Sequence, residues 1–114
     1  MLFRSYVGPS FDDAFGLPPA EAMACGLPVI ASSHAGVSEI VTDGIDGLVI
    51  KDPTSPEELA ELIRRLHSDP ALRSSLGTNA VKTASQLTWE HNAEEMHALL
   101  TRLLEQKQQG ARPR

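Results

Sequence analysis

The 114-residue sequence predicts an α/β fold in which short parallel strands are followed by three helices. Residues 29–31 and 48–50 are short runs of Val, Ile, Leu and Ala, bounded by turn-forming residues, as is typical of buried parallel strands. Apolar residues at helical spacing occur between and after these runs. Strands that alternate with helices form parallel sheets, which bind ligands beyond the carboxyl ends of their strands.

The start of the chain supplies the segment that we expect at this edge of the sheet. Residues 6–9 are predicted to end a first strand, and residues 10–17 to form the loop that follows it. Residues 20–25 are predicted as a short helix that Gly26 ends, because glycine readily takes the left-handed conformation found after helices.

Two helices are predicted after the strand at residues 48–50. Ser55, Pro56 and Glu58 mark the start of the first, as its N-cap, a proline at its first position and the glutamate of a capping box. Its apolar face comprises Leu59, Leu62, Ile63 and Leu66. Asp69 and Pro70 begin the second helix. The inner side of that helix carries Leu72, Leu76 and Ala80.

Thr88 is predicted to cap a last helix, with Trp89 as its anchor in the core. The apolar stripe of this helix comprises Trp89, Ala93, Met96, Leu100 and Leu103. Residues 105–114 are polar and are predicted to be a disordered tail. A single domain is therefore expected over residues 1–104.

Composition excludes several classes of protein. The formal net charge of -5 argues against a nucleic-acid-binding protein, which would carry a basic face. The single cysteine, Cys25, cannot form an internal disulfide, which suits a reducing compartment, and we expect it to be a small buried hydrophobe. No apolar run approaches the roughly 20 residues of a transmembrane helix. We therefore expect a cytoplasmic protein, one that at full length could still contact a membrane peripherally.

The loop over residues 10–17 and the helix after it together predict an anion site. Gly16 allows a tight turn, and Pro18 and Pro19 are tolerated in the first turn of a helix. Such a turn directs free backbone N–H groups and the positive end of a helix dipole at one point. Asp13 and Glu21 flank it and can accept hydrogen bonds from hydroxyl groups. A nucleotide sugar combines the phosphates and hydroxyls that this arrangement would bind.

Each carboxylate also has an ordinary interpretation. Glu21 is predicted in the first turn of its helix, where the dipole alone favours a carboxylate. Asp13 could be a turn aspartate that bonds to nearby amides, and Asp12 beside it is a competing candidate. The four histidines are predicted to be structural or solvated, because His34 has no companion at metal-ligand spacing and the others lie on predicted helices.

The segment D-A-F-G-L-P-P-A-E-A-M-A-C-G, residues 13–26, resembles the donor-binding signature of the group 1 glycosyltransferases, a retaining family with the GT-B fold. The likeness continues through P-V-I-A-S, S-E-I-V, D-G-I-D-G-L-V-I and L-T-W-E, and covers roughly residues 5–104. The first acidic position is Asp13, where the family more often has glutamate.

The resemblance implies a role for each residue of the predicted site. Glu21 would accept hydrogen bonds from the ribose hydroxyls of the nucleotide. Asp13 would contact the transferred sugar and help to stabilise positive charge near its anomeric carbon. The amides of Phe15, Gly16 and Leu17 would contact the sugar or its diphosphate. No metal or other cofactor is expected, because GT-B enzymes typically neutralise the leaving diphosphate with basic side chains and helix dipoles.

The resemblance also implies that this chain is the carboxy-terminal part of a GT-B enzyme. The family places an acceptor-binding domain, the first half of the donor domain, and an Arg and a Lys for the diphosphate upstream of the signature. The function implied is transfer of a hexose from a nucleoside diphosphate sugar to a hydroxyl acceptor, with this chain binding the donor. The alternative is a non-catalytic nucleotide-sugar-binding or interaction module that has kept the fold.

Overall fold

The computed structural model describes residues 4–110 and has a three-stranded parallel sheet at its centre. The strands are β1 (Tyr6–Gly8), β2 (Val29–Ser32) and β3 (Leu48–Ile50), in the spatial order β1-β2-β3. Both pairings are parallel. The predicted α/β class, the strand positions and the parallel sheet are therefore confirmed.

Strand β2 is the centre of the core because every one of its residues is buried. Val29 and Ala31 pack on one side, in a cluster that includes Met23 from the helix that precedes β2. Ile30 packs on the other side with Leu48 and further residues of β3 and the later helices. A strand covered on both faces is continuously apolar, which is the pattern that the sequence shows at this point.

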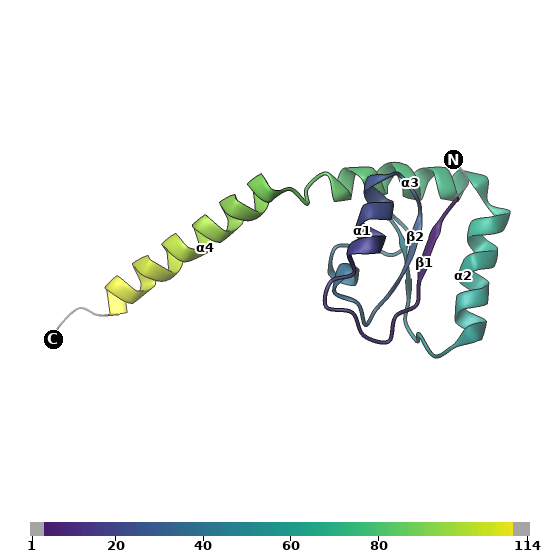
Figure 1. The fold of residues 1–114 in the computed structure, drawn as a ribbon, viewed down its shortest axis with the longest axis horizontal. Helices are drawn as coiled ribbons and strands as arrows, with labels where there is room; N and C mark the ends of the chain where they lie inside the picture. The colour runs from purple at the N-terminus through teal and green to yellow at the C-terminus, as the bar shows by residue number, and fades with distance from the viewer. Residues whose placement is uncertain (1–3, 111–114) are drawn as a thin grey trace.

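Helices cover both faces of the sheet (Figure 1). The helices of the described chain are α1 (Leu17–Ala24), the short 3₁₀ helix η1 (Gly36–Glu39), α2 (Pro56–Ser68), α3 (Pro70–Ala84) and α4 (Trp89–Gly110), of which α4 does not cover the sheet. Helices α1 and α2 lie on opposite sides of the strands, and α3 runs across the end of the sheet in contact with both.

The predicted helix starts are present, with one difference. The Ser55 side chain accepts a hydrogen bond from the Glu58 amide at 3.1 Å, as an N-cap should. The Glu58 carboxylate does not complete the capping box. It accepts instead from the amides of Lys51 and Asp52, at 2.7 and 2.9 Å, and so ties the segment after β3 to the first turn of α2.

Asp46 joins the loop before β3 to helix α3. Asp46 is 5% exposed, and its carboxylate accepts hydrogen bonds from the Thr42 amide at 2.7 Å and the Thr83 hydroxyl at 2.6 Å. A buried carboxylate needs such partners, because an unpaired one would be strongly destabilising. These two hydrogen bonds of Asp46 give it a structural role, in elements other than loop 10–17.

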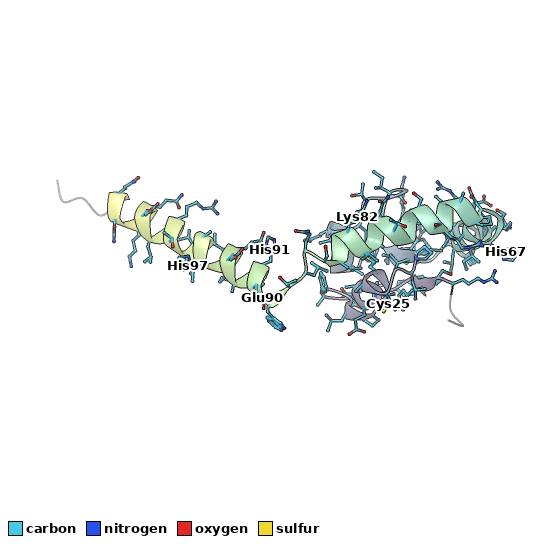
Figure 2. All side chains as sticks on the ribbon, turned by 90° about the horizontal axis from the view of Figure 1, so that it is seen from above. Cys25, His67, Lys82, Glu90, His91 and His97 are labelled. Atoms are coloured by element: carbon cyan, nitrogen blue, oxygen red, sulfur yellow. The ribbon has the colours of Figure 1, made fainter. Side chains whose placement is uncertain are left out.

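Three predictions about burial and order are wrong. Cys25 is exposed at the end of α1 (Figure 2), because the helix begins earlier than predicted and its buried face ends at Met23. Trp89 does not anchor the core, since its side chain is 85% exposed. The disordered tail was predicted from residue 105, but α4 continues through Gly110; residues 111–114 lie outside the described part of the chain.

Helix α4 is separate from the rest of the molecule. It extends away from the sheet (Figure 1), which gives the described residues dimensions of 67 × 29 × 18 Å. None of its residues is buried. The predicted cap is present, because the Thr88 hydroxyl accepts a hydrogen bond from the His91 amide at 3.1 Å.

Helix α3 crosses the end of α1 at a glycine, and this contact yields a test of the packing. A Cβ atom on Gly77 would lie 2.3 Å from the Gly26 carbonyl oxygen. Replacing a helix-interior glycine with alanine ordinarily stabilises a protein by roughly 0.5–1 kcal/mol. We expect Gly77→Ala to lower the free energy of unfolding instead, by about 1–3 kcal/mol, because the backbones must separate.

Urea unfolding measures this change. The matched control is Thr78→Ala, at an exposed position of the same helix, which should gain a few tenths of a kcal/mol, about 0.5 at most, from helix propensity. A Gly77→Ala chain at least as stable as the original would contradict the close packing of α1 and α3.

Candidate functional site

Loop 10–17 follows β1 at the carboxyl edge of the sheet and is held there by a second loop. The Gly36 amide donates a hydrogen bond to the Asp13 carbonyl oxygen at 3.0 Å, and the Val37 amide donates to the Phe15 carbonyl oxygen. Asp13 and Ala35 thereby form a parallel bridge outside the main sheet. The backbone of loop 10–17 is thus fixed by the segment that follows β2.

The second loop makes two further contacts that the sequence did not predict. A Cβ atom on Gly36 would lie 2.1 Å from the Ala14 carbonyl oxygen, so only glycine lets the loops approach so closely. The His34 ring nitrogen Nδ1 lies 3.0 Å from the Phe11 carbonyl oxygen. The one indication of these contacts in the sequence is the glycine of H-A-G, Gly36. Its role is evident only when the two loops are seen to be adjacent, because a side chain at this position would clash with Ala14.

The turn into α1 leaves a group of backbone donors without acceptors. Gly16 is the N-cap of α1 with a φ of 87°, in the left-handed region, and no side chain caps the helix. Within residues 4–110, no atom accepts a hydrogen bond from the amides of Phe15, Gly16 or Leu17. Pro18 and Pro19 have no N–H groups. The free donors are therefore concentrated in the turn itself.

The two predicted carboxylates differ in their surroundings. Asp13 is half-buried, and its Oδ2 atom lies 3.5 Å from the point that a Cβ on Gly16 would occupy, so the carboxylate stands beside the turn. Glu21 is exposed on α1. Helix α1 begins at Leu17, three residues earlier than predicted, and its first turn holds no acidic residue. The interpretation of Glu21 as a first-turn carboxylate favoured by the dipole is therefore wrong.

A surface depression of about 220 Å³ brings part of the predicted site together. Its lining comprises Phe15, Leu17, Ala20, Glu21, Ala24, Ala84 and Leu87. A neighbouring depression of about 240 Å³ shares Phe15 and Leu87. Its other lining residues are Thr88, Trp89 and Asn92. Asp13 lines neither of them. The segment L-T-W-E, quoted above only as part of the family likeness, thus lies beside Phe15.

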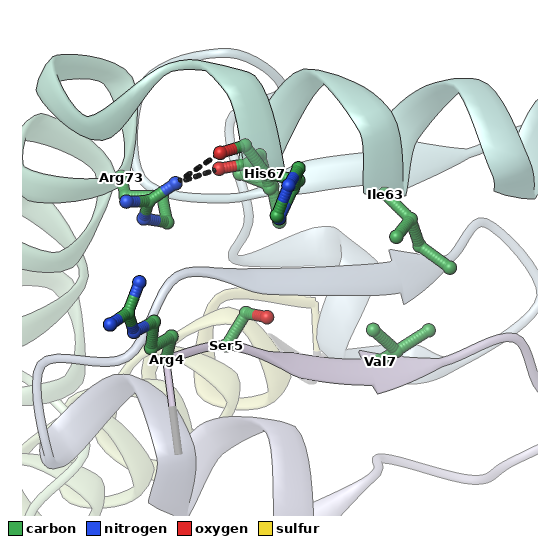
Figure 3. A pocket seen from close by; sticks show the side chains of 7 residues that line it. Arg4, Ser5, Val7, Ile63, His67 and Arg73 are labelled. Atoms are coloured by element: carbon green, nitrogen blue, oxygen red, sulfur yellow. Dashed lines mark hydrogen bonds between the residues drawn. The ribbon is translucent and has the colours of Figure 1, made fainter. Parts of the chain in front are cut away.

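Another depression, of about 150 Å³, lies between β1 and α2, and the arginine in its lining that makes hydrogen bonds has a structural role (Figure 3). Arg4 and Ser5 line it at the amino-terminal end of β1, at the edge of the sheet opposite to loop 10–17. The Arg73 guanidinium donates to the carbonyl oxygens of Leu66 and of His67, the latter at 2.8 Å. Arg73 therefore satisfies the last carbonyl groups of α2, which have no partner within the helix.

The histidines are dispersed. Figure 2 shows His67 on the body of the molecule and His91 and His97 along α4. Across residues 4–110, no three His, Cys, Asp or Glu side chains are grouped as a metal site would require. In the same part of the chain, no helix is long and apolar enough to cross a membrane.

Comparison with known proteins finds glycosyltransferases among both the related sequences and the similar structures. The sequence profile of the family described as "Glycosyl transferases group 1" matches residues 3–83. The chain is 38% identical to a D-inositol 3-phosphate glycosyltransferase of Nocardioides sp. over 87 residues, which is 76% of this chain and 19% of that relative. The chain therefore spans about a fifth of the length of this curated relative.

Solved structures show the same likeness. A sucrose-phosphate synthase from Thermosynechococcus elongatus matches with a TM-score of 0.76 and 38% identity, over 90% of this chain and 26% of that one. The structure of HepE from Anabaena in complex with UDP-glucose matches with a TM-score of 0.68 and 29% identity, over 83% of this chain and 26% of that one. These neighbours are GT-B glycosyltransferases. The chain belongs to the group 1 glycosyltransferase family.

Proposed function

We propose that this chain binds the nucleoside diphosphate sugar in a protein that transfers a hexose, with retention, to a hydroxyl acceptor. The observation that carries the proposal is the turn at residues 15–17, whose amides have no acceptor within residues 4–110 and which two carboxylates flank. Membership of the family supports it, as does the similarity to a structure that contains UDP-glucose.

The turn supplies an anion site without basic side chains. The amides of Phe15, Gly16 and Leu17 and the positive end of the α1 dipole favour a phosphate group locally. The net charge of -5 does not oppose this, because surface charges beyond about 8 Å are largely screened at physiological salt. No metal is needed for this part of the binding, so we propose that the donor is held without one.

Glu21 would bind the ribose of the nucleotide. It is exposed and lies at the rim of the apolar depression that Phe15, Ala24 and Leu87 line. A carboxylate beside an apolar wall can accept hydrogen bonds from two adjacent hydroxyls while the wall packs against the ring, as an acidic residue does for ribose in dinucleotide folds.

Asp13 would act on the transferred sugar. In the reaction, the bond from the anomeric carbon to the diphosphate oxygen breaks and its electrons leave with the diphosphate. The acceptor hydroxyl oxygen forms the new bond to that carbon, and its proton passes to the departing diphosphate. The anomeric carbon becomes more positive as the old bond lengthens. A carboxylate beside Gly16 would stabilise that charge more strongly in the transition state than in the bound donor.

The isolated chain gives the first test. We expect it to bind UDP-glucose weakly, with a Kd in the millimolar range or about -4 kcal/mol, and to catalyse no detectable glycosyl transfer. The family places the acceptor domain and the basic residues for the diphosphate outside this segment. NMR titration of the amides at residues 15–17 measures binding, and multiple turnovers over a panel of donors and acceptors would contradict the proposal.

The two carboxylates can be distinguished in a longer family member that contains this segment. Glu21→Ala should weaken donor binding by roughly 1.5–3 kcal/mol, because it removes hydrogen bonds to a charged acceptor that exist before and during the reaction. Asp13→Ala should instead lower kcat more than donor affinity. Donor titration and steady-state kinetics measure the two effects.

Asp13→Glu examines the unusual aspartate. If the pocket is an ordinary one for this family, the longer side chain should keep or raise kcat; if the pocket has adapted to aspartate, the extra methylene should crowd the sugar and kcat should fall. Asp12→Ala is the matched control, at the exposed neighbouring position, and should change kcat little.

Loss of turnover in Asp12→Ala with full turnover in Asp13→Ala would assign the catalytic carboxylate to Asp12 instead of Asp13. Donor binding without any turnover in the original protein would favour the non-catalytic module.

Gly36→Ala tests whether the second loop positions the donor amides. The added Cβ would force the Ala14 carbonyl group away, so the hydrogen bonds from Gly36 and Val37 should break. We expect hydrogen exchange at Val37 to accelerate and donor affinity to fall about tenfold, or 1.4 kcal/mol. Ser33→Ala, which removes only a surface hydrogen bond to the Lys51 carbonyl, is the control. Unchanged affinity in Gly36→Ala would show that the turn does not depend on this contact.

A further inference from the structure

The pairing between loop 10–17 and the second loop, residues 33–37, continues one step beyond its backbone hydrogen bonds. In a parallel pairing, the amides of one strand donate at two-residue intervals to carbonyl groups of the other. The Gly36 amide donates to the Asp13 carbonyl oxygen at 3.0 Å. Two residues earlier, the same pattern would join the His34 amide to the Phe11 carbonyl oxygen.

The His34 amide is not available for that bond. It donates instead to the hydroxyl oxygen of Ser32 at 3.0 Å. Ser32 ends β2 and is fully buried, so its hydroxyl needs such a partner. The ring nitrogen Nδ1 of His34 lies 3.0 Å from the Phe11 carbonyl oxygen. The side chain of His34 thus takes the place of its own amide.

The acceptor determines where the proton of this ring lies. A carbonyl oxygen can only accept, so Nδ1 must carry the hydrogen for the bond to form. In a neutral imidazole, the other ring nitrogen, Nε2, is then unprotonated. The contact therefore requires one particular neutral tautomer of His34, and that tautomer can be observed.

The second loop is itself anchored to the sheet on its other side. The Ser33 amide donates to the Ile50 carbonyl oxygen at 3.0 Å, and the Ser33 hydroxyl donates to the Lys51 carbonyl oxygen at 2.9 Å. A hydrogen bond from His34 to Phe11 consequently ties loop 10–17 to a segment that β3 already holds.

The place of this bond along loop 10–17 decides what it controls. The bonds to the carbonyl groups of Phe11 and Asp13 lie before and after the side chain of Asp13. The bond from Val37 to the Phe15 carbonyl group lies further on, at the turn whose amides have no acceptor in the described chain. Loss of the first bond frees the backbone ahead of Asp13 and leaves the two bonds nearest the turn in place.

We propose that His34 is a positioning residue for the Asp13 carboxylate, acting through the Nδ1–H hydrogen bond to the Phe11 carbonyl group. The proposal rests on the proposed function, because Asp13 matters for turnover only if the chain serves in glycosyl transfer. It separates the two loop contacts by role: the His34 ring sets the carboxylate, and the amides of Gly36 and Val37 set the donor-binding turn.

NMR of the full 114-residue chain tests the contact without any donor. Long-range ¹H–¹⁵N spectra at about pH 8, where a histidine ring is ordinarily neutral, identify the protonated nitrogen. We expect the proton of His34 on Nδ1. His34→Ala should shift the resonance of the Asp12 amide, which shares a peptide group with the Phe11 carbonyl. A neutral ring with its proton on Nε2 would overturn the proposal.

Kinetics of a longer family member that contains this segment test the role. His34→Ala should lower kcat about tenfold, because a displaced carboxylate stabilises the transition state less well. Its Kd for UDP-glucose should stay within about twofold of the original. Ser33→Ala is the matched control. It removes a hydrogen bond of the same loop on the side away from loop 10–17, and should change neither quantity.

Two amide side chains distinguish the hydrogen bond from the bulk of the ring. His34→Asn places an N–H group close to the position of Nδ1 and should restore kcat to within about threefold of the original. His34→Gln places its N–H group nearer the position of Nε2 and should behave like His34→Ala. Glutamine that restores kcat as well as asparagine does would overturn the proposal.

The remaining outcomes separate this proposal from the proposed function. Donor affinity that falls as much as kcat in His34→Ala would show that the ring supports the whole site and not Asp13 in particular, which overturns the proposal. A longer protein without turnover refutes the role of Asp13 and this proposal with it. Normal turnover together with a proton on Nε2 of His34 refutes this proposal alone.

Discussion

The close approach of Gly36 to the backbone of Ala14 is the contact on which the arrangement of the site depends. Because no side chain intervenes there, the segment after β2 can donate hydrogen bonds to the carbonyl groups of Asp13 and Phe15. Those carbonyl groups consequently point toward the second loop. The amides of residues 15–17 are left without an acceptor in the described chain, although they belong to the same turn. Loop 10–17 is thus held in place through its carbonyl groups, while these amides have no acceptor in the described chain.

The two prolines of α1 reduce the number of free N–H groups at the start of the helix. An ordinary helix presents four free N–H groups over its first turn. Here Pro18 and Pro19, both within the first turn of α1, remove two of them. The donors are therefore confined to the turn around Gly16, where the left-handed φ of 87° orients them. Because α1 begins at Leu17, Glu21 lies beyond the first turn, which is where the helix dipole most favours a carboxylate.

Local chemistry explains which features the sequence could predict. The strands at 29–31 and 48–50 and the caps at Ser55 and Thr88 depend on near neighbours in the chain, and all were predicted correctly. The loop contacts were not predicted, because they join residues 13–15 to residues 34–37 and have no local signature beyond one glycine. Cys25 and Trp89 were placed in the core from residue type alone, but burial depends on which side of a helix meets a neighbour. The roles of Asp13, Phe15, Gly16, Leu17 and Glu21 in donor binding remain predictions.

Helix α4 begins beside the candidate site, because Trp89 and Phe15 line the same depression. A helix with no buried residue derives little stability from capping and from an exposed pair such as His91 and Glu95, which is worth only a few tenths of a kcal/mol, about 0.5 at most. Its order therefore depends on whatever covers the stripe. Trp89 belongs both to that stripe and to the depression that it shares with Phe15. Because Phe15 also lines the depression beside Glu21, a partner on α4 and a ligand at the turn would contact one continuous wall. Where both prefer particular positions of Phe15, each must alter the affinity of the other by the same factor, since coupling between two binding equilibria is reciprocal.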